Sequence, residues 1–226
     1  VLGEQPTHPQ LLDWLASELI DGGWSIKRIH RAILLSSTYR MSSGFNADND
    51  RRDGENRLLW RMNPRRLEVE AWRDGLMAVT GELTRGLGGP PTDKLLDSDR
   101  RTLYSIISRN GDRFASDRFL RLFDFPAARI TSEKRAVSTV PQQHLFMLNS
   151  PFMLARAKAL ARRLAKERDS ESARIELAYV LLFTRKPSQE ELALGRSFLA
   201  EEGKGLPKWE QYAQALLSAQ EFLYAH

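Results

Sequence analysis

The chain has 226 residues, which is enough for one large domain or two small ones with a sizeable hydrophobic core. It contains no cysteine, and this excludes disulfide bonds, thiolate chemistry, iron–sulfur clusters and covalent haem attachment within the sequence. Its net charge of +5 raises nucleic-acid binding as a hypothesis, but the basic residues are spread along the chain and mixed with acids instead of forming one basic patch beside stacking aromatics. No apolar run approaches the ~20 residues that a membrane-spanning helix needs.

The N-terminal stretch predicts a helical hairpin. It opens on VLGEQPTHPQ without an initiator Met, so we expect a piece of a longer protein. Thr7 is a candidate N-cap for a first helix that runs to Ile20, and Gly22 and Gly23 end it. Ser25 can cap a second helix that runs as far as Tyr39.

Residues 41–55 are predicted to form a polar loop. Asp48, Asp50 and Asp53 suggest a calcium site, but their spacing does not match the twelve-residue calcium loop and no Glu stands at its last position. We therefore interpret the stretch as a solvated loop.

Residues 56–83 predict the central helix. Asn63 can cap its N-terminus, and Pro64 suits the first helical position. Apolar residues then recur at spacings of three and four, which is the helical period. This stripe consists of Val69, Trp72, Leu76, Val79 and Leu83.

The same stretch is dense in charges, and two interpretations of them stay open. In the first, the charges form a structural network of ion pairs, with Arg66–Glu70 and Glu70–Arg73 at helical pair spacing. In the second, Arg65, Arg66 or Arg73 holds an anionic ligand, with Glu68 or Glu70 as acid or base.

The middle of the chain is less regular. Residues 84–100 read as a Gly- and Pro-rich connector that lacks the phosphate-loop pattern. The β-branched and aromatic run 102–108 is the best strand candidate. A short helix over 116–123 follows and ends in a fixed turn at Asp124.

The C-terminal part predicts only helices. They begin near Pro141, Phe152, Glu171, Gln189 and Pro207, and Ser188 with Glu191 forms a capping box for the fourth of them. We therefore expect a mainly α fold, a multi-helix orthogonal array with at most one short β segment. It would form a single helical domain over 1–226, with 1–138 and 139–226 as an alternative subdivision.

Recognisable catalytic signatures are missing from the sequence. The four histidines are scattered without metal-pair spacing, and no nucleophile–base motif is present. Glu68 and Glu70, two residues apart, would lie on different faces of a helix. The sequence therefore supports no particular reaction.

Several motifs in order along the chain resemble a known family. They include PTHPQLLDWLA, GWSIKRIHRAILLSSTYR, ENRLLWRMNPRRLEVEAWRD, RRTLYSIISRN, LFDFP, TVPQQHLFMLNSPF and ALLSAQEFLYAH. Together they resemble the planctomycete-specific C-terminal domain of unknown function, which is found in planctomycete-type cytochrome c domain-containing proteins. The resemblance implies a C-terminal piece of a large, exported, multidomain bacterial protein, located in the periplasm or outside the cell. It supplies no reaction.

The resemblance covers nearly the whole chain and carries over to matching positions only. The central motif is matched by Asn56, Arg57, Trp60, Arg61, Arg65, Arg66, Leu67, Glu68, Glu70, Arg73 and Asp74. The strand-like motif is matched by Arg101, Tyr104 and Arg109, the FDFP turn by Phe123–Pro126, and the PQ…LN helix by Pro141, Gln142, Leu148 and Asn149. His144 departs from the family pattern, in which Ala is usual, so we assign it no role.

Three hypotheses for function follow. The first is a non-catalytic binding or scaffold module whose partners are the other domains of the same polypeptide, with an anionic ligand or polysaccharide as a further candidate partner. The second is a catalytic domain, hydrolytic or redox-coupled, that acts on an extracellular polymer at an Arg/Glu site. The third, nucleic-acid binding, is the least favoured.

We expect no cofactor in this chain, since haem would belong to a separate domain. The candidate anion-binding or buried ion-pair residues are Arg61, Arg65, Arg66, Glu68, Glu70, Arg73, Asp74, Arg101, Tyr104 and Arg109.

Overall fold

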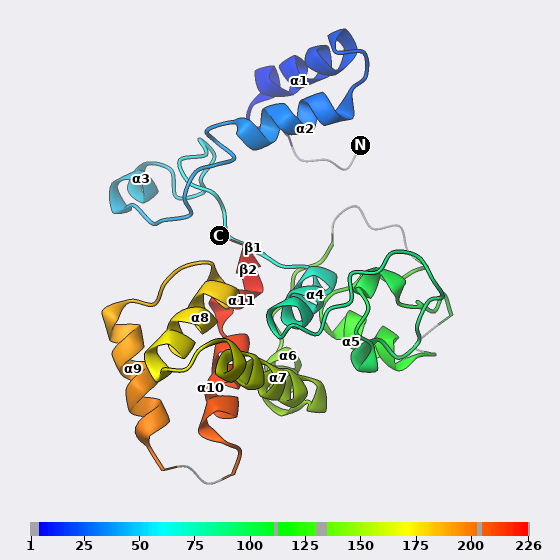
Figure 1. The fold of residues 1–226 in the computed structure, drawn as a ribbon. Coiled ribbons are helices and arrows are strands. Elements are labelled where there is room, and N and C mark those ends of the chain that lie inside the picture. Colours follow the sequence, from blue (N-terminus) through cyan, green and yellow to red (C-terminus); the bar gives the residue numbers. More distant parts are fainter. Residues whose placement is uncertain (1–4, 111–112, 130–134, 203–204, 226) are drawn as a thin grey trace. The chain divides into compact units, whose positions relative to one another are not determined.

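The computed structural model describes residues 5–110, 113–129, 135–202 and 205–225, and over these ranges the fold is mainly α, as expected (Figure 1). The regular structure of these described ranges consists of eleven α-helices, two short 3₁₀ helices and one two-stranded sheet. The chain divides into two compact units, one ending at Arg65 and the other running from Arg66 to Ala225. This division differs from the alternative boundary at residue 138. No helix in the described ranges is both long and apolar enough to cross a membrane.

The first unit contains the expected helical hairpin. It consists of α1 (Pro9–Asp21) and α2 (Ile26–Leu35), and the Ser25 side chain accepts a hydrogen bond from the backbone N–H of Arg28 at 3.4 Å. α2 ends earlier than predicted, and the loop over 41–55 contains a short helix, α3 (Ala47–Arg52). No residue of these three helices is buried.

The predicted start of the central helix is wrong. The Asn63 side-chain oxygen caps no helix but accepts a hydrogen bond from the Nδ2 of Asn56 at 3.0 Å, and the same Nδ2 donates to the carbonyl of Arg61 at 2.8 Å. Asn56 is buried and has a left-handed backbone with φ of +53°, which Asn tolerates better than most residues. Its side chain therefore shapes residues 56–63 into a turn instead of a helix.

The second unit holds the hydrophobic core. Its central helix is α4 (Val69–Val79), which buries Trp72 against Phe123 and Phe119 with ring centroids 4.6 and 6.4 Å apart. The aromatic rings come from α5 (Ala115–Leu122) and from the FDFP turn that follows it.

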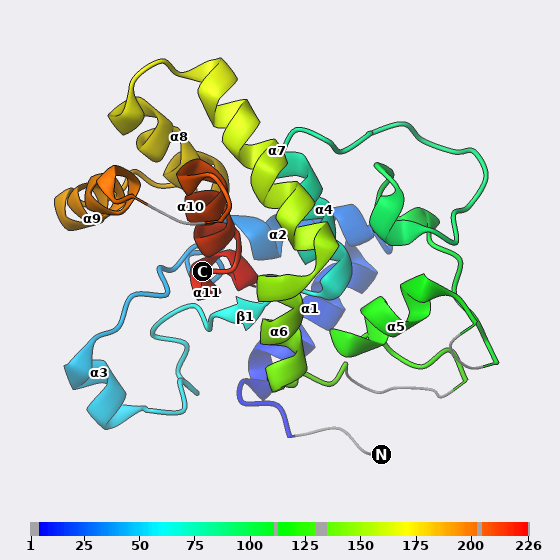
Figure 2. The same ribbon diagram turned by 90° about the horizontal axis from the view of Figure 1, so that it is seen from below.

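The remaining helices follow the sequence prediction closely. They are α6 (Pro141–Asn149), α7 (Pro151–Glu167), α8 (Glu171–Phe183), α9 (Gln189–Ala200), α10 (Lys208–Leu217) and α11 (Gln220–Leu223). The capping box is present, because the Ser188 and Glu191 side chains each accept a backbone hydrogen bond from the other residue. α7 packs extensively against α10 (Figure 2). The single helix expected after Pro207 is instead two helices, with a break at Ser218.

The small sheet is not where the sequence predicts a strand. It pairs β1 (Arg65–Arg66) with β2 (Tyr224–Ala225). The run 102–108 begins as a 3₁₀ helix, η2 (Thr102–Tyr104), and then forms one isolated bridge between Ser105 and Thr92. A single bridge gives the segment backbone partners without a continuous ladder, so it runs as an extended segment.

Candidate functional site

Arg73 is the most deeply buried charge of the predicted site. Its side chain is 0% exposed, and α4 points it toward the segment after η1 (Leu95–Asp97). One terminal nitrogen donates to the carbonyl of Arg100 at 2.8 Å, and the other donates to the carbonyls of Leu95, at 2.6 Å, and Ser98. The two terminal nitrogens thus hold three backbone carbonyls, which are polar partners of the kind that a buried charge requires, while the buried Nε has no hydrogen-bond partner among the described residues.

Asp74 completes this arrangement. Its carboxylate lies 3.3 Å from Arg73 and accepts hydrogen bonds from the backbone N–H and the hydroxyl of Thr102 at 2.8 and 2.7 Å. Burial lowers the pKa of Arg73, and the neighbouring Asp74 carboxylate opposes that shift. Arg73 and Asp74 therefore fasten the segment from Leu95 to Thr102 to α4.

Arg66 holds a second junction. Its guanidinium donates to the side-chain oxygen of Gln143 at 3.0 Å and to the carbonyl of Ser138, and it lies 3.5 Å from Asp124. Asp124 has a φ of +66° and accepts hydrogen bonds from the backbone N–H and hydroxyl of Ser138. These contacts join the turn after α5 to the start of α6.

Glu70 pairs with Arg135. The two side chains form paired hydrogen bonds of 2.8 Å each, and the same guanidinium lies 3.2 Å from Glu68. Burial raises the pKa of Glu70, but its hydrogen bonds and its attraction to Arg135 outweigh that effect and lower it overall. The predicted pairing of Glu70 with Arg66 and Arg73 is wrong, because those arginines bind other segments.

We define the charged centre as Arg66, Glu68, Glu70, Arg73 and Asp74, and of the other candidate residues Arg101 borders it through an ion pair with Asp74. Arg61 belongs to the first unit, where its guanidinium stacks on Trp60 and Phe45. Arg65 and Arg109 are exposed, and Arg101 reaches only the outer oxygen of Asp74, at 3.6 Å.

Tyr104 has a local structural role. Arg100 lies over its ring, 3.8 Å from the centroid, and donates to the carbonyls of Gly88 and Pro90. The Tyr104 hydroxyl accepts a hydrogen bond from the N–H of Gly88 at 2.8 Å. Together these bonds fix the Gly- and Pro-rich connector in place.

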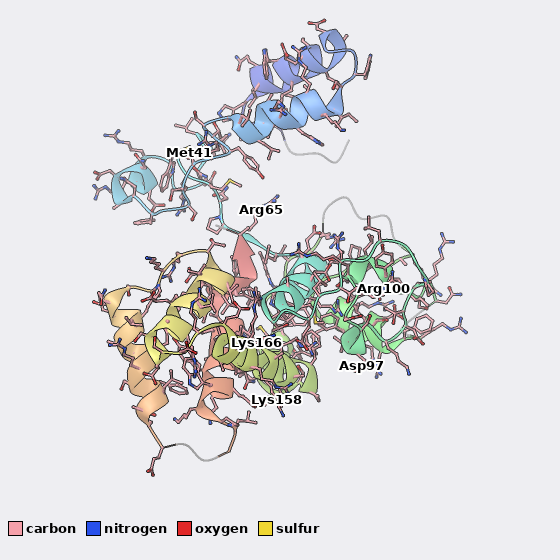
Figure 3. All side chains as sticks on the ribbon, viewed as in Figure 1. Met41, Arg65, Asp97, Arg100, Lys158 and Lys166 are labelled. Atoms are coloured by element: carbon pink, nitrogen blue, oxygen red, sulfur yellow. The ribbon has the colours of Figure 1, made fainter. Side chains whose placement is uncertain are left out.

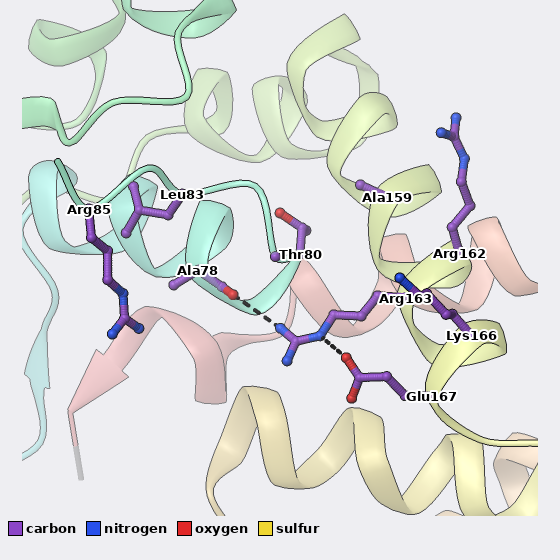
Figure 4. Close-up of a pocket in the computed structure, with 10 residues that line it drawn as sticks. Ala78, Thr80, Leu83, Arg85, Ala159, Arg162, Arg163, Lys166 and Glu167 are labelled. Carbon is purple, nitrogen blue, oxygen red and sulfur yellow. Dashed lines mark hydrogen bonds and ion pairs between the residues drawn. The ribbon is translucent and has the colours of Figure 1, made fainter.

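Two pockets in the second unit lie apart from the charged centre. One, of about 490 Å³, is formed by the C-terminal end of α4 and by α7 (Figure 4). The other, of about 520 Å³, lies between η1 and the start of α7. Neither pocket is lined by any of the predicted site residues.

The sequence analysis did not single out Arg135, the partner of Glu70, or the cations of the α4–α7 pocket. Arg135 stands 65 positions from Glu70, and nothing in its neighbourhood indicates a partner. Two cations of the α4–α7 pocket do have a signal in the sequence: Arg162 and Lys166 continue, with Lys158 one turn before them, a row of cations every four residues along one helix. Among the described residues, no cluster of three or more His, Cys, Asp or Glu could hold a metal ion.

Comparison with known proteins gives a family without an assigned activity. A family model described as "PSD1: Protein of unknown function (DUF1553)" matches residues 1–199. No curated protein and no solved structure matches the chain significantly.

Proposed function

We propose that this chain, which belongs to the PSD1 family of proteins of unknown function (DUF1553), is a non-catalytic binding or scaffold module of a larger exported bacterial protein. Its partners would be the other domains of that polypeptide, including a cytochrome c domain. Haem would belong to that separate domain, and the protein would lie in the periplasm or outside the cell. The planctomycete origin and the cytochrome c association rest on the motif resemblance alone.

One observation supports a structural role for the charged centre. Arg73 has no exposed surface, and its terminal nitrogens all point to carbonyls or side chains of the same chain. A catalytic or ligand-binding arginine must present at least one donor to a substrate. Both terminal nitrogens of Arg73 are occupied, and its Nε, which has no partner among the described residues, is buried out of reach of a substrate. Its hydrogen bonds instead join segments that are distant in sequence.

The catalytic alternative has weaker support. Glu70, the candidate acid or base, is engaged by both terminal nitrogens of Arg135. An ion pair of this kind favours a permanently ionised carboxylate, whereas a general acid or base works best with a pKa near the working pH.

Arg73→Met tests the structural role. Removing Arg73 takes the guanidinium donor away from three carbonyls and leaves Asp74 with its bonds from Thr102 and its ion pair with the more exposed Arg101. We therefore expect the free energy of unfolding to fall by about 3–5 kcal/mol, measured by urea denaturation. The matched control is Arg118→Met on α5, where the arginine is exposed and the change should stay within about 0.5 kcal/mol.

A neutral or stabilising Arg73→Met would contradict the scaffold role, since functional groups are often held at a cost to stability. Nucleic-acid binding is tested separately by retention on a DNA column. We expect no retention even at low salt, where phosphate contacts are strongest.

A further inference from the structure

The pocket between α4 and α7 is unusually basic. Arg85, Arg162, Arg163 and Lys166 line it, and Glu167 is its only acidic residue. The rest of its wall consists of Thr80 and of four small or apolar residues, Ala78, Gly81, Leu83 and Ala159. Figure 4 shows Arg163 extending from α7 toward the carbonyl of Ala78, with Arg162 and Lys166 beside it on α7 and Arg85 on the segment that follows α4.

One of these cations is used by the fold itself. Arg163 donates to the carbonyls of Ala78 and Val79 at 3.1 and 2.8 Å, and so satisfies the C-terminal end of α4. It also pairs with Glu167 at 2.7 Å. Arg163 therefore neutralises Glu167, the single carboxylate of the pocket.

The other cations have no comparable use. Arg85, Arg162 and Lys166 are exposed, and within the described ranges no hydrogen bond or ion pair engages their side chains. Arg162 and Lys166 stand four residues apart on α7, where like charges repel by a few tenths of a kcal/mol. Lys158 continues the same row one turn earlier (Figure 3).

We infer that this pocket binds a small ligand carrying two or more anionic groups, either carboxylates or phosphates. A volume of about 490 Å³ lies in the range of small-molecule sites, which is roughly 300–1,000 Å³. Cations on successive turns of α7 are roughly 6 Å apart along the axis, so two of them can each face one anionic group. The inference concerns a different place from the charged centre and would stand if the scaffold role were wrong.

The lining also argues against a nucleotide or nucleic-acid ligand. None of the residues that line the pocket is aromatic. Sites that take bases generally provide an aromatic ring on which the base stacks. The pocket instead offers a lysine ammonium and guanidinium groups, which suit oxyanions attached to a small polar body.

Isothermal titration calorimetry at low ionic strength tests the inference. The probes are citrate, which carries carboxylates, and inorganic tripolyphosphate. We expect at least one to bind with a stoichiometry of one, and the preferred probe identifies the anionic group. In the Arg162→Glu/Lys166→Glu variant, affinity should fall by at least about tenfold, because two attractive charges become repulsive.

The matched control replaces Arg118 and Lys186 by Glu, since both are exposed and lie outside the pocket. The control variant has the same change in net charge as the test variant, but its substitutions lie outside the pocket. Its affinity for the probe should therefore stay within about twofold of wild type. Amide shifts of the unmodified protein provide a check that needs no variant: the probe should move the Gly81 and Lys166 signals but not that of Gly195. Absence of binding by both probes, or an equal loss in the control, would overturn the inference.

Discussion

At the scale of single residues, Glu70 shows how one partly buried ion pair makes stability depend on pH. Its carboxylate has a pKa below the ordinary value of 4.5, because the bonds from Arg135 outweigh the effect of burial. A carboxylate with a lowered folded-state pKa stabilises the fold above its unfolded-state pKa. This contribution is lost as the pH falls through the folded-state value.

Glu70→Gln should therefore destabilise the protein at neutral pH but not in acid. We expect a loss of about 0.5–1.5 kcal/mol at pH 7, since one charge-assisted hydrogen-bond pair is weakened. Below the lowered pKa of Glu70, wild type and variant should have equal free energies of unfolding. Urea titrations at a series of pH values measure the difference.

Glu68→Gln is the control for this prediction. Glu68 faces the same Arg135, but its side chain is 61% exposed, so water screens the pair. Its substitution should change stability by less than about 0.5 kcal/mol at every pH. If the two variants behave alike, the paired geometry of Glu70 and Arg135 contributes nothing specific.

At the scale of helices, local signals predicted most elements. Ser188 and Glu191 lie three residues apart and mark the start of α9 in the sequence as they do in the structure. Such features involve neighbours on one turn, so the sequence contains all of their parts.

The predictions that failed depend on contacts between distant residues. The sequence predicts Asn63 as a helix cap, but its side-chain oxygen accepts a hydrogen bond from the buried Asn56 instead. Likewise, the partners of Arg66, which are Asp124 and Gln143, lie 58 and 77 residues away along the chain. The sequence identified the charged side chains of the centre, but their partners are set by tertiary packing.

The effect of a glycine-to-alanine substitution should differ between two helical glycines, Gly75 and Gly195. A Cβ added at Gly75, on α4, would lie 3.7 Å from the Cζ of Phe222, which is an ordinary contact. A Cβ at Gly195, on α9, would lie 2.7 Å from the hydroxyl of Tyr212 and 3.2 Å from Ile175, both buried. Gly75→Ala should thus be neutral or stabilise by up to about 1 kcal/mol, while Gly195→Ala should destabilise by about 1–3 kcal/mol.

Thermal melts and urea denaturation of both variants compare the same chemical change in two surroundings. Helix propensity favours alanine equally at the two positions, so only the contacts differ. A stabilising Gly195→Ala would show that α9 can move away from α10 at little cost.

At the scale of the whole molecule, the two units differ in what stabilises them. Every buried apolar residue of the core lies between Val69 and Leu223, in the second unit. In the first unit, α1 and α2 bury none of their residues, and Asn56 is the only buried residue described there. Burial of apolar surface is the main favourable contribution to folding, so stability should reside in the second unit.

A fragment covering 64–226, which retains both strands of the sheet, should therefore fold alone. We expect a cooperative melt by circular dichroism, with a midpoint within about 5 °C of the intact chain, because no core residue is removed. The complementary fragment 1–63 should show little helix, since isolated helices shorter than ~12–15 residues are marginal in water. A broad melt for 64–226, or a stable helical 1–63, would show that residues before Pro64 contribute to stability in a way that their burial does not reveal.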